Sequence, residues 1–427
     1  MVMVAVALMA MTGSALATEA RIMALGGDVA PYICDDANIY VWYATLPSYS
    51  NLMIIGMYND WYYGYGDGGD DVEAYYGLTY ALGDEGSWGT LAIGLMENTQ
   101  GPNQDGWMAD DIMDMFWDDW DDEDIFDWSL YNRYMLMYGY QMEGMSFGLY
   151  FSRASEADKY EEDYGDPYEE EWKEAYTTLG LGFRMDIGED MVLDAAFDWT
   201  KATYLYTYTD IDEDDEADPG SAMAFRARMF YDWREDLTFV PYFDFATKDF
   251  AYSPADEFYS DEGYGMKAMA FKFGIGANMN VNEDNMIVFA VEPFAYWKGE
   301  PSGYTDGYED EWEVTIKTMP KFILALESDL TDWLTFRTGC SKALTKWGYS
   351  WNDEDDTQEA WQTYGPNWDW NQFAWNLGLG FHFGDFDIDC VLNKDVPFSM
   401  GYWLTGFQNN YENETTPIGM ISAVYHF

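Results

Sequence analysis

Long segments of the chain alternate apolar and polar residues with a period of two, which is the pattern of β-strands with two different faces. The segment 178–200 shows it most clearly. On its first half one face carries Leu179, Leu181, Phe183, Met185 and Ile187, and the other carries Gly180, Gly182, Arg184 and Asp186. A short Gly-Glu-Asp turn at 188–190 leads into a second alternating run. We predict a β-hairpin whose two faces meet different surroundings.

This hairpin belongs to a repeat in which successive short acidic turns lie roughly 46 to 53 residues apart. The turns are at Glu143-Gly144, Gly188 to Asp190, Arg234 to Asp236, Asn282 to Asn285, Thr331-Asp332 and Gly384-Asp385, with a less regular one at Gly83 to Ser87. Long acidic stretches separate them, at 98–127, 155–174, 210–220, 253–263, 299–311, 351–369 and 394–416. Short turns at one end and long loops at the other are typical of outer-membrane barrels.

We therefore predict an all-β protein, a transmembrane antiparallel β-barrel with short periplasmic turns and long acidic extracellular loops. The strand count is about sixteen, or fourteen if either 51–58 or 386–393 is outside the wall. The apolar strand face is too aromatic and continuous for a soluble core, so we expect it to meet lipid. The face with glycine, arginine and aspartate then lines the lumen.

Composition agrees with this fold and excludes several others. Aromatic residues make up 19% of the chain, which is unlike a disordered acidic protein. Beyond the first residues no apolar run is long enough for a membrane helix, and the mean hydropathy is −0.36. A barrel accounts for both facts because only alternate residues touch lipid. The net charge of −59 would repel phosphate and argues against nucleic acid as a partner.

The two ends of the chain indicate export to the bacterial outer membrane. Residues 1–17 have an apolar core followed by Ala15-Leu16-Ala17, which predicts a signal peptide, although no Lys or Arg precedes Arg21. The alternative is a buried strand or helix of the mature protein. The C-terminal strand, 418–427, ends in the aromatic Phe427, as barrel strands that are recognised for membrane insertion do.

Residues 18–50 are rich in small residues and do not alternate, so we expect them to lie outside the wall of a barrel formed by residues 51–427. This segment resembles the N-terminal region of the FadL-type and PorV-type outer-membrane barrels. The matching elements are Ala20-Arg21, Gly26-Gly27, Asp35-Asp36-Ala37 and Ala44-Thr45-Leu46, while Trp42-Tyr43 stand where that family has Asn-Pro. The resemblance implies a fourteen-stranded barrel in which the N-terminal segment, residues 18–50, plugs the lumen. It gives Arg21, Gly26, Gly27, Asp35 and Asp36 a role in this plug.

The resemblance also implies a function. Members of the family pass long-chain fatty acids or aromatic hydrocarbons, and the PorV-like branch helps secretion and surface attachment. Uptake of a small hydrophobic or amphipathic compound is our first hypothesis. A non-transporting surface scaffold that docks exported proteins through residues 98–127 is the second. The third, suggested by charge alone, is an open cation-preferring porin.

Alternation places many of the charged residues inside the lumen. The predicted inward cations are Arg133, Arg184, Arg226, Arg228, Lys272, Lys317, Lys321 and Arg337. The predicted inward acids are Asp186, Asp194, Asp198, Asp232, Asp244, Glu292, Glu327, Asp387 and Asp389, and Asn278 shares the lumen face. One interpretation is a salt-bridge network that braces the plug. The other is that Arg226, Arg228 and Lys272 hold an anionic headgroup, since guanidinium geometry suits a carboxylate.

The loops carry most of the negative charge. Clustered carboxylates are ligands for hard cations, so Ca²⁺ is a possible cofactor at Asp210, Asp212, Asp214 and Asp218. The alternatives are simple solvation and the repulsion of anions. Cys34, Cys340 and Cys390 show no metal spacing; one pair could bridge, although packing is the simpler role. His382 and His426 have no recognisable nucleophile nearby in sequence, so we expect no enzyme.

Overall fold

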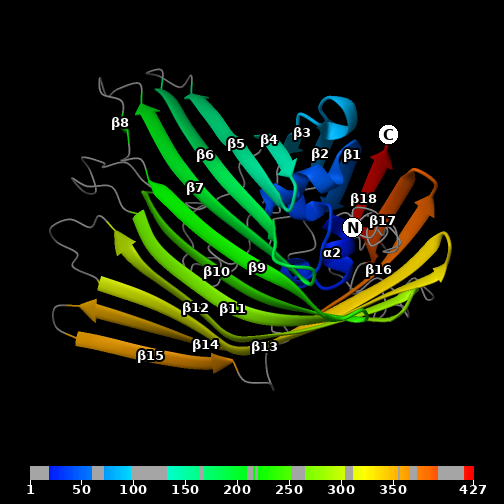
Figure 1. Cartoon of the computed structure of the whole chain (residues 1–427). Helices are drawn as coiled ribbons and strands as arrows, with labels where there is room; N and C mark the ends of the chain where they lie inside the picture. The colour runs from blue at the N-terminus through cyan, green and yellow to red at the C-terminus, as the bar shows by residue number, and fades with distance from the viewer. Residues whose placement is uncertain are drawn as a thin grey trace, which may run out of the picture.

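The structure, a computed structural model, describes residues 19–59, 72–97, 132–162, 168–208, 215–216, 220–251, 265–302, 311–353, 356–364, 373–392 and 418–427. The predicted signal peptide, 1–17, and the predicted calcium ligands at 210, 212, 214 and 218 lie outside these residues. Within them, sixteen antiparallel strands close into a barrel, which confirms the predicted fold class (Figure 1).

The wall strands are β1 (Leu52–Asn59), β2 (Val72–Ala81), β3 (Thr90–Glu97), β4 (Asn132–Met142), β5 (Met145–Glu162), β6 (Tyr168–Asp186), β7 (Met191–Tyr208), β9 (Ser221–Arg234), β10 (Leu237–Ala251), β11 (Gly265–Asn282), β12 (Asn285–Ser302), β13 (Glu311–Thr331), β14 (Leu334–Asp353), β16 (Phe373–Phe383), β17 (Phe386–Leu392) and β18 (Ile418–His426). Two further strands extend the sheet outside this ring. These are β8 (Asp215–Glu216), which pairs with β7, and β15 (Asp356–Tyr364), which pairs with β14.

The first and last wall strands close the barrel. β1 pairs with β18 from Leu52 opposite His426 to Tyr58 opposite Met420, and β1 also pairs with β2. Closure matters because lipid offers no hydrogen-bond partner to an open sheet edge. Both β1 and β17 are part of the wall, so sixteen strands is right and the fourteen implied by the family resemblance is wrong.

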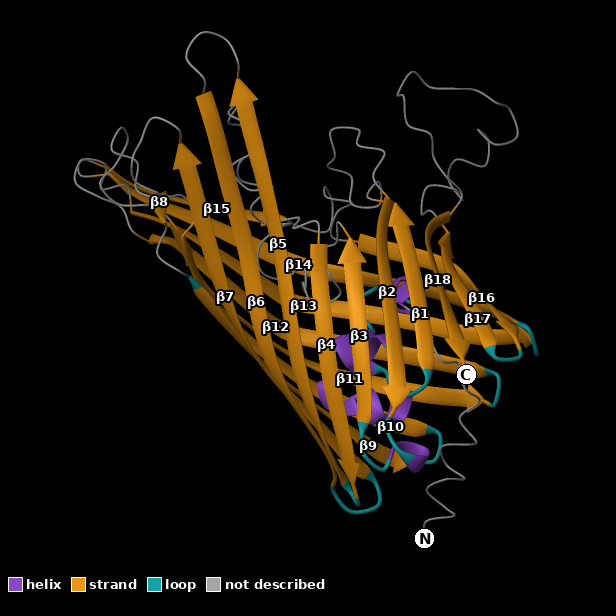
Figure 2. Ribbon diagram, turned by 90° about the horizontal axis from the view of Figure 1, so that it is seen from above, coloured by secondary structure: helices purple, strands orange, loops and turns teal. Residues whose placement is uncertain are grey.

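The short turns lie where the repeat predicted them, and all of them are at one end of the barrel (Figure 2). The hairpins extend further toward the other end than predicted. Strands β5 and β6 continue to Glu162 and from Tyr168, through most of the stretch assigned to a loop at 155–174. The two strands pair without interruption there, from Ser155 opposite Ala175 to Glu162 opposite Tyr168, so acidity alone was a poor indicator of a loop.

The outward face is apolar and exposed. Leu149 is 52% exposed, Leu181 57%, Phe273 46% and Leu324 48%, values that would be costly in water over so continuous a surface. The intervening residues point inward and are small or polar, and many are buried, such as Ala196, Ala270 and Ser152. The apolar face therefore meets lipid and the polar face meets the lumen, as predicted.

Residues 19–50 fill the lumen with short helical segments (Figures 1 and 2). They are α2 (Glu19–Ala24), η1 (Ala30–Tyr32), η2 (Ala37–Tyr40) and η3 (Tyr43–Tyr49), and a further turn, η5 (Asp84–Gly86), joins β2 to β3. Helix α2 contacts β14, β16, β17 and β18, whereas η3 contacts β2 to β6. Among the described residues, none of the helices has the length and apolar character needed to cross a membrane.

The lipid-facing assignment makes a direct prediction at Leu181, which lies between Leu149 and Phe197 on the neighbouring strands. Leu181→Arg should lower the free energy of unfolding by about 2–4 kcal/mol, because a cation would face hydrocarbon. Leu181→Phe, the control, keeps an apolar side chain and should change stability little. Denaturant titration of the barrel in lipid vesicles measures both, and equal losses would contradict the assignment.

Candidate functional site

Inward-facing glycines allow the plug to approach the wall closely. A Cβ on Gly339 would lie 1.8 Å from the carbonyl oxygen of Leu25, and one on Gly148 would lie 2.2 Å from the carbonyl carbon of Tyr43. Gly182 is similar, since its Cβ would lie 2.6 Å from the amide nitrogen of Ala44. The glycine face predicted from the sequence is therefore a docking surface for residues 19–50.

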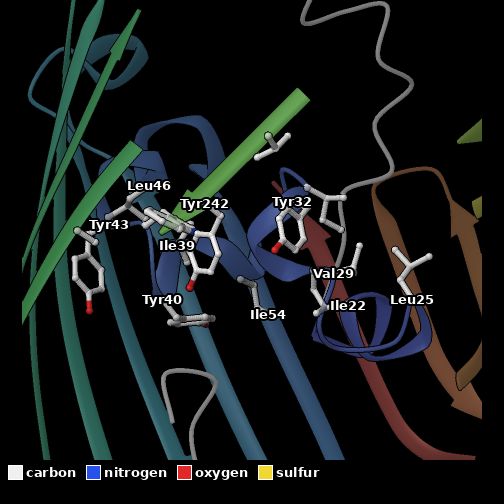
Figure 3. Close-up of a cluster of buried hydrophobic side chains, with 14 of the residues drawn as sticks. Ile22, Leu25, Val29, Tyr32, Ile39, Tyr40, Tyr43, Leu46, Ile54 and Tyr242 are labelled. Atoms are coloured by element: carbon white, nitrogen blue, oxygen red, sulfur yellow. The ribbon is translucent and has the colours of Figure 1, made fainter. Parts of the chain in front are cut away.

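An aromatic and aliphatic core joins plug to wall (Figure 3). Tyr43 stacks on Tyr150 with ring centroids 4.7 Å apart. Tyr32 and Trp42 each pack edge-on against Tyr242, at 6.0 and 6.3 Å. Burial of this aromatic surface is a main source of the free energy that holds the plug in place.

A chain of ion pairs fixes the first part of the plug. Arg21 makes a bidentate contact with Glu327, with nitrogen–oxygen distances of 2.6 and 2.8 Å, and a second contact of 2.9 Å with Asp35. Arg337 binds the same Glu327 at 2.6 Å and also pairs with Asp389. All five side chains are buried. Each charge has a partner of opposite sign, which is the condition for keeping charges away from water.

A second cluster surrounds Arg228. Its Nε contacts Asp194 at 3.1 Å, and its Nη1 donates to the backbone carbonyl of Ile33 at 2.9 Å. The guanidinium carbon also lies 4.4 Å from the centroid of the Trp42 ring. Arg184 shares Asp194, at 3.2 Å. The cluster therefore binds wall to plug through charge, backbone and an aromatic face.

Arg226 lies at the centre of a third cluster. It contacts Asp198 at 2.7 Å and Asp244 at 3.7 Å, and Asp198 accepts a 2.5 Å hydrogen bond from the hydroxyl of Tyr43 in the plug. In the register, Asp244 lies between Arg226 on β9 and Lys272 on β11, so opposite charges face each other across strands. The Lys272 ammonium lies 5.3 Å from the centroid of the Tyr242 ring.

Three further predicted lumen residues, Glu292, Asn278 and Lys321, also contact the plug. Glu292 accepts a 3.0 Å hydrogen bond from the Tyr32 hydroxyl, and Asn278 donates to the Tyr32 carbonyl at 2.6 Å. Lys321 pairs with Asp28 at 2.5 Å. Sequence reasoning did not identify Asp28, Tyr32 or Tyr43 as residues that contact the wall. Their signal was weak, since a plug has no periodicity that marks which residues face the wall.

Lys317 does not line the lumen, contrary to the prediction. It is directly opposite Tyr296 on β12, whose ring packs against the outward Phe271, and its ammonium lies 5.8 Å from the Tyr296 ring centroid. The pairing register shifts between Thr318 and Lys321, around Pro320. Such an irregularity moves following residues to the other face, so Lys317 points outward although Lys321 points inward.

The plug glycines and aspartates have local structural roles. Gly26 and Gly27 follow α2 with φ angles of 102° and 69°, and the Gly27 amide donates to the Ile22 carbonyl at 2.9 Å, as at a helix C-terminus. Asp36 caps η2 through the Ala37 amide. Burial and the neighbouring Asp35 carboxylate raise the pKa of Asp36 well above its ordinary value of 3.8.

Both histidines of the chain share one carboxylate, a link that sequence spacing did not reveal. His382 Nδ1 lies 2.7 Å from Asp387 and His426 Nε2 lies 3.2 Å from its other oxygen. The hydroxyl of Thr335 is 2.9 Å from His382 Nε2, but it is fully buried and donates to Asp329. It is therefore not placed as an exposed nucleophile.

The described residues of this site contain neither a disulfide nor a cluster of potential metal ligands. No group of three or more His, Cys, Asp or Glu within the described ranges could hold a metal ion. Cys34, Cys340 and Cys390 are free thiols. The calcium hypothesis concerns residues outside the described ranges and stays a prediction.

Comparisons with known proteins show similarity in architecture. No protein-family model matches the chain, and no curated protein does. Among solved structures, the toluene transporter TodX of Pseudomonas putida matches 96% of this chain and 98% of its own, with 10% identity and a TM-score of 0.40. CdiB of Acinetobacter baumannii matches 88% of this chain and 59% of its own (7% identity, TM-score 0.41). The alcaligin receptor FauA of Bordetella pertussis matches 88% of this chain and 75% of its own, with 7% identity and a TM-score of 0.40.

The closed barrel, its lipid-facing exterior and its plugged interior define the class of this protein. It is a β-barrel of the bacterial outer membrane. A hydrocarbon transporter is among the solved structures that this chain resembles.

Removing a cation from the plug network should be costly. Arg337→Met would leave Glu327 and Asp389 with one arginine fewer, and we expect a loss of about 3–5 kcal/mol in the free energy of unfolding. Arg234→Met is the control, because its pair with Asp236 at the rim is exposed and such pairs contribute at most about 1 kcal/mol. Denaturant titration in lipid measures the free energy of unfolding of both variants. Similar losses in Arg337→Met and Arg234→Met would contradict a structural role for the network.

The raised pKa of Asp36 predicts a pH-dependent plug. A carboxyl whose folded pKa exceeds its unfolded value stabilises the fold fully at low pH, and this stabilisation is lost as pH rises through the folded pKa. Asp36→Asn should therefore protect plug amides from hydrogen exchange better than wild type at pH 8, with no difference at pH 4. Asp35→Asn, which weakens the Arg21 contact, should reduce protection at pH 8. The same response from both variants would contradict the assignment.

Proposed function

We propose that the protein takes up small hydrophobic or amphipathic compounds through its plugged lumen. The observation that carries this proposal is the interface between residues 19–50 and the wall, which combines tyrosine and tryptophan rings with buried cations. Hydrated ions and sugars would not pack on such aromatic rings. An apolar or amphipathic molecule can pack on its rings, and an anionic headgroup can replace a carboxylate beside a cation.

The cations are unequal candidates for a headgroup. Arg228 is held between Asp194 and the plug backbone, so its geometry favours bracing. Arg226 sits between Asp198 and Asp244. Lys272 is beside the Tyr242 ring, next to the aromatic contacts of Trp42 and Tyr32, and there a cation and an apolar surface adjoin. Lys272 is therefore the residue whose substitution we would test.

The other two hypotheses are less well supported. An open cation-preferring porin requires a clear lumen, whereas the plug is buried against many strands around the ring. The surface scaffold rests on residues 98–127, which lie outside the described residues.

Ligand binding by the protein in lipid nanodiscs tests the proposal, with decanoate, decanol and glucose as probes and tryptophan fluorescence as the readout. We expect decanoate and decanol to bind and glucose not to bind. Lys272→Met should weaken decanoate binding by roughly ten- to a hundredfold, because a charge-assisted hydrogen bond contributes about 1.5–3 kcal/mol, and should leave decanol binding unchanged.

Failure of both decanoate and decanol to bind would contradict the proposal. A stable exported partner that is lost on deletion of residues 98–127 would then favour the scaffold.

A further inference from the structure

A series of hydrogen bonds joins five wall strands at the short-turn, periplasmic end of the lumen. It begins at Asp329 on β13, passes through Thr335 on β14 and His382 on β16, and reaches Asp387 on β17 and His426 on β18. These strands are neighbours at the end of the chain, and β18 is the strand that closes the barrel against β1 (Figure 1). We call these five residues the rim cluster.

The rim cluster lies one step toward the periplasm from the ion pairs that hold the plug. Thr335 is two residues from Arg337 and Asp387 is two residues from Asp389, and residues two apart share a strand face. Thr335 and Asp387 are buried, whereas the two histidine side chains are 22% and 23% exposed. The imidazole rings can therefore exchange protons with water while their partners are held away from it.

The hydrogen bonds fix the number of protons on His382. Thr335 donates its single hydroxyl proton to Asp329 at 2.5 Å, because Asp329 is exposed and an exposed carboxylate is ionised at neutral pH. The Thr335 oxygen must then accept from His382 Nε2, which is 2.9 Å away. On the other side of the ring, Nδ1 is 2.7 Å from the Asp387 carboxylate. An imidazole is a stronger base than a carboxylate, so both ring nitrogens carry protons and His382 is an imidazolium.

The surrounding charges are compatible with a charged His382. The charged groups that face it from the neighbouring strands are Asp387 and Asp389 on β17, Asp329 on β13 and Arg337 on β14. Arg337 and Asp389 pair with each other, which leaves two carboxylates for one imidazolium. His426 needs only one ring proton, on Nε2, to donate to the second oxygen of Asp387 at 3.2 Å.

We propose that His382 is a proton-operated connection in the periplasmic rim, which joins β14 to β17 while it is charged and breaks when the proton is lost. A neutral ring has one N–H, so it can donate to Thr335 or to Asp387 but not to both. The stability that the connection contributes is fully present below about pH 6.5, the ordinary value for histidine, and is lost as pH rises through the value at which the folded protein releases the proton. The connection is independent of the proposed uptake.

Nitrogen-15 NMR of the protein in lipid nanodiscs counts the protons on each imidazole ring. The chain has two histidines, so His426→Gln identifies the signals of His382. We expect His382 to carry two ring protons at pH 7.5, where an ordinary histidine is about 90% neutral. Thr335→Val removes the acceptor of Nε2 and should raise the ratio of neutral to charged ring at least roughly tenfold, since a hydrogen bond from a charged group is lost. Thr335→Ser, the matched control, keeps the hydroxyl and should keep the charge.

Hydrogen exchange of the amides in 418–427 measures the consequence for the rim. After correction for intrinsic rates, exchange in the wild type should accelerate roughly tenfold or more between pH 6 and pH 9, and Thr335→Ser should behave in the same way. His382→Gln has no titrating ring and should give protection that does not change with pH. A singly protonated His382 in the wild type at pH 7.5 would overturn the proposal. Equal pH dependence in the wild type and His382→Gln would do the same.

Discussion

The contact between Arg21 and Glu327 is the interaction on which the plugged state depends most. Arg21 is in the first described helix, and through Glu327 it is connected to Arg337 and then to Asp389 on β17. Buried charges are tolerated only when they are paired. Removal of any one of these residues would therefore leave another buried charge without one of its partners. The network therefore fixes residues 19–50 to the wall, so that the plug and the barrel act as one unit.

The wall has two different surroundings, lipid on its outer face and the plug and lumen on its inner face. Lipid requires a closed sheet and apolar outward residues. The pairing of β1 with β18 closes the sheet. The inward face has no such restriction, and it carries glycines where the plug backbone comes close and opposite charges where strands lie side by side. Asp194 between Arg184 and Arg228, and Asp244 between Arg226 and Lys272, show how register alone brings these partners together.

Much of this arrangement was predictable because a strand has only two faces. Alternation identified the lipid face, the lumen face, the turns and the wall strands, and it placed Arg184, Arg226, Arg228 and Arg337 correctly inside. It failed at Lys317, because the irregularity between Thr318 and Lys321 changes the face. Pro320 was the available signal, since proline inside a strand often marks such a site. Partners within the plug were beyond sequence reasoning, because a segment without periodicity does not indicate its contacts.

The central claim is that residues 19–50 close the lumen. Conductance of the purified barrel in a planar bilayer tests it most directly, with the full chain compared with a variant that lacks residues 19–50. The account predicts no steady conductance for the full chain and steady ion-conducting steps after the deletion. Large, steady, cation-selective steps from the full chain would contradict it and would mean that the lumen is open.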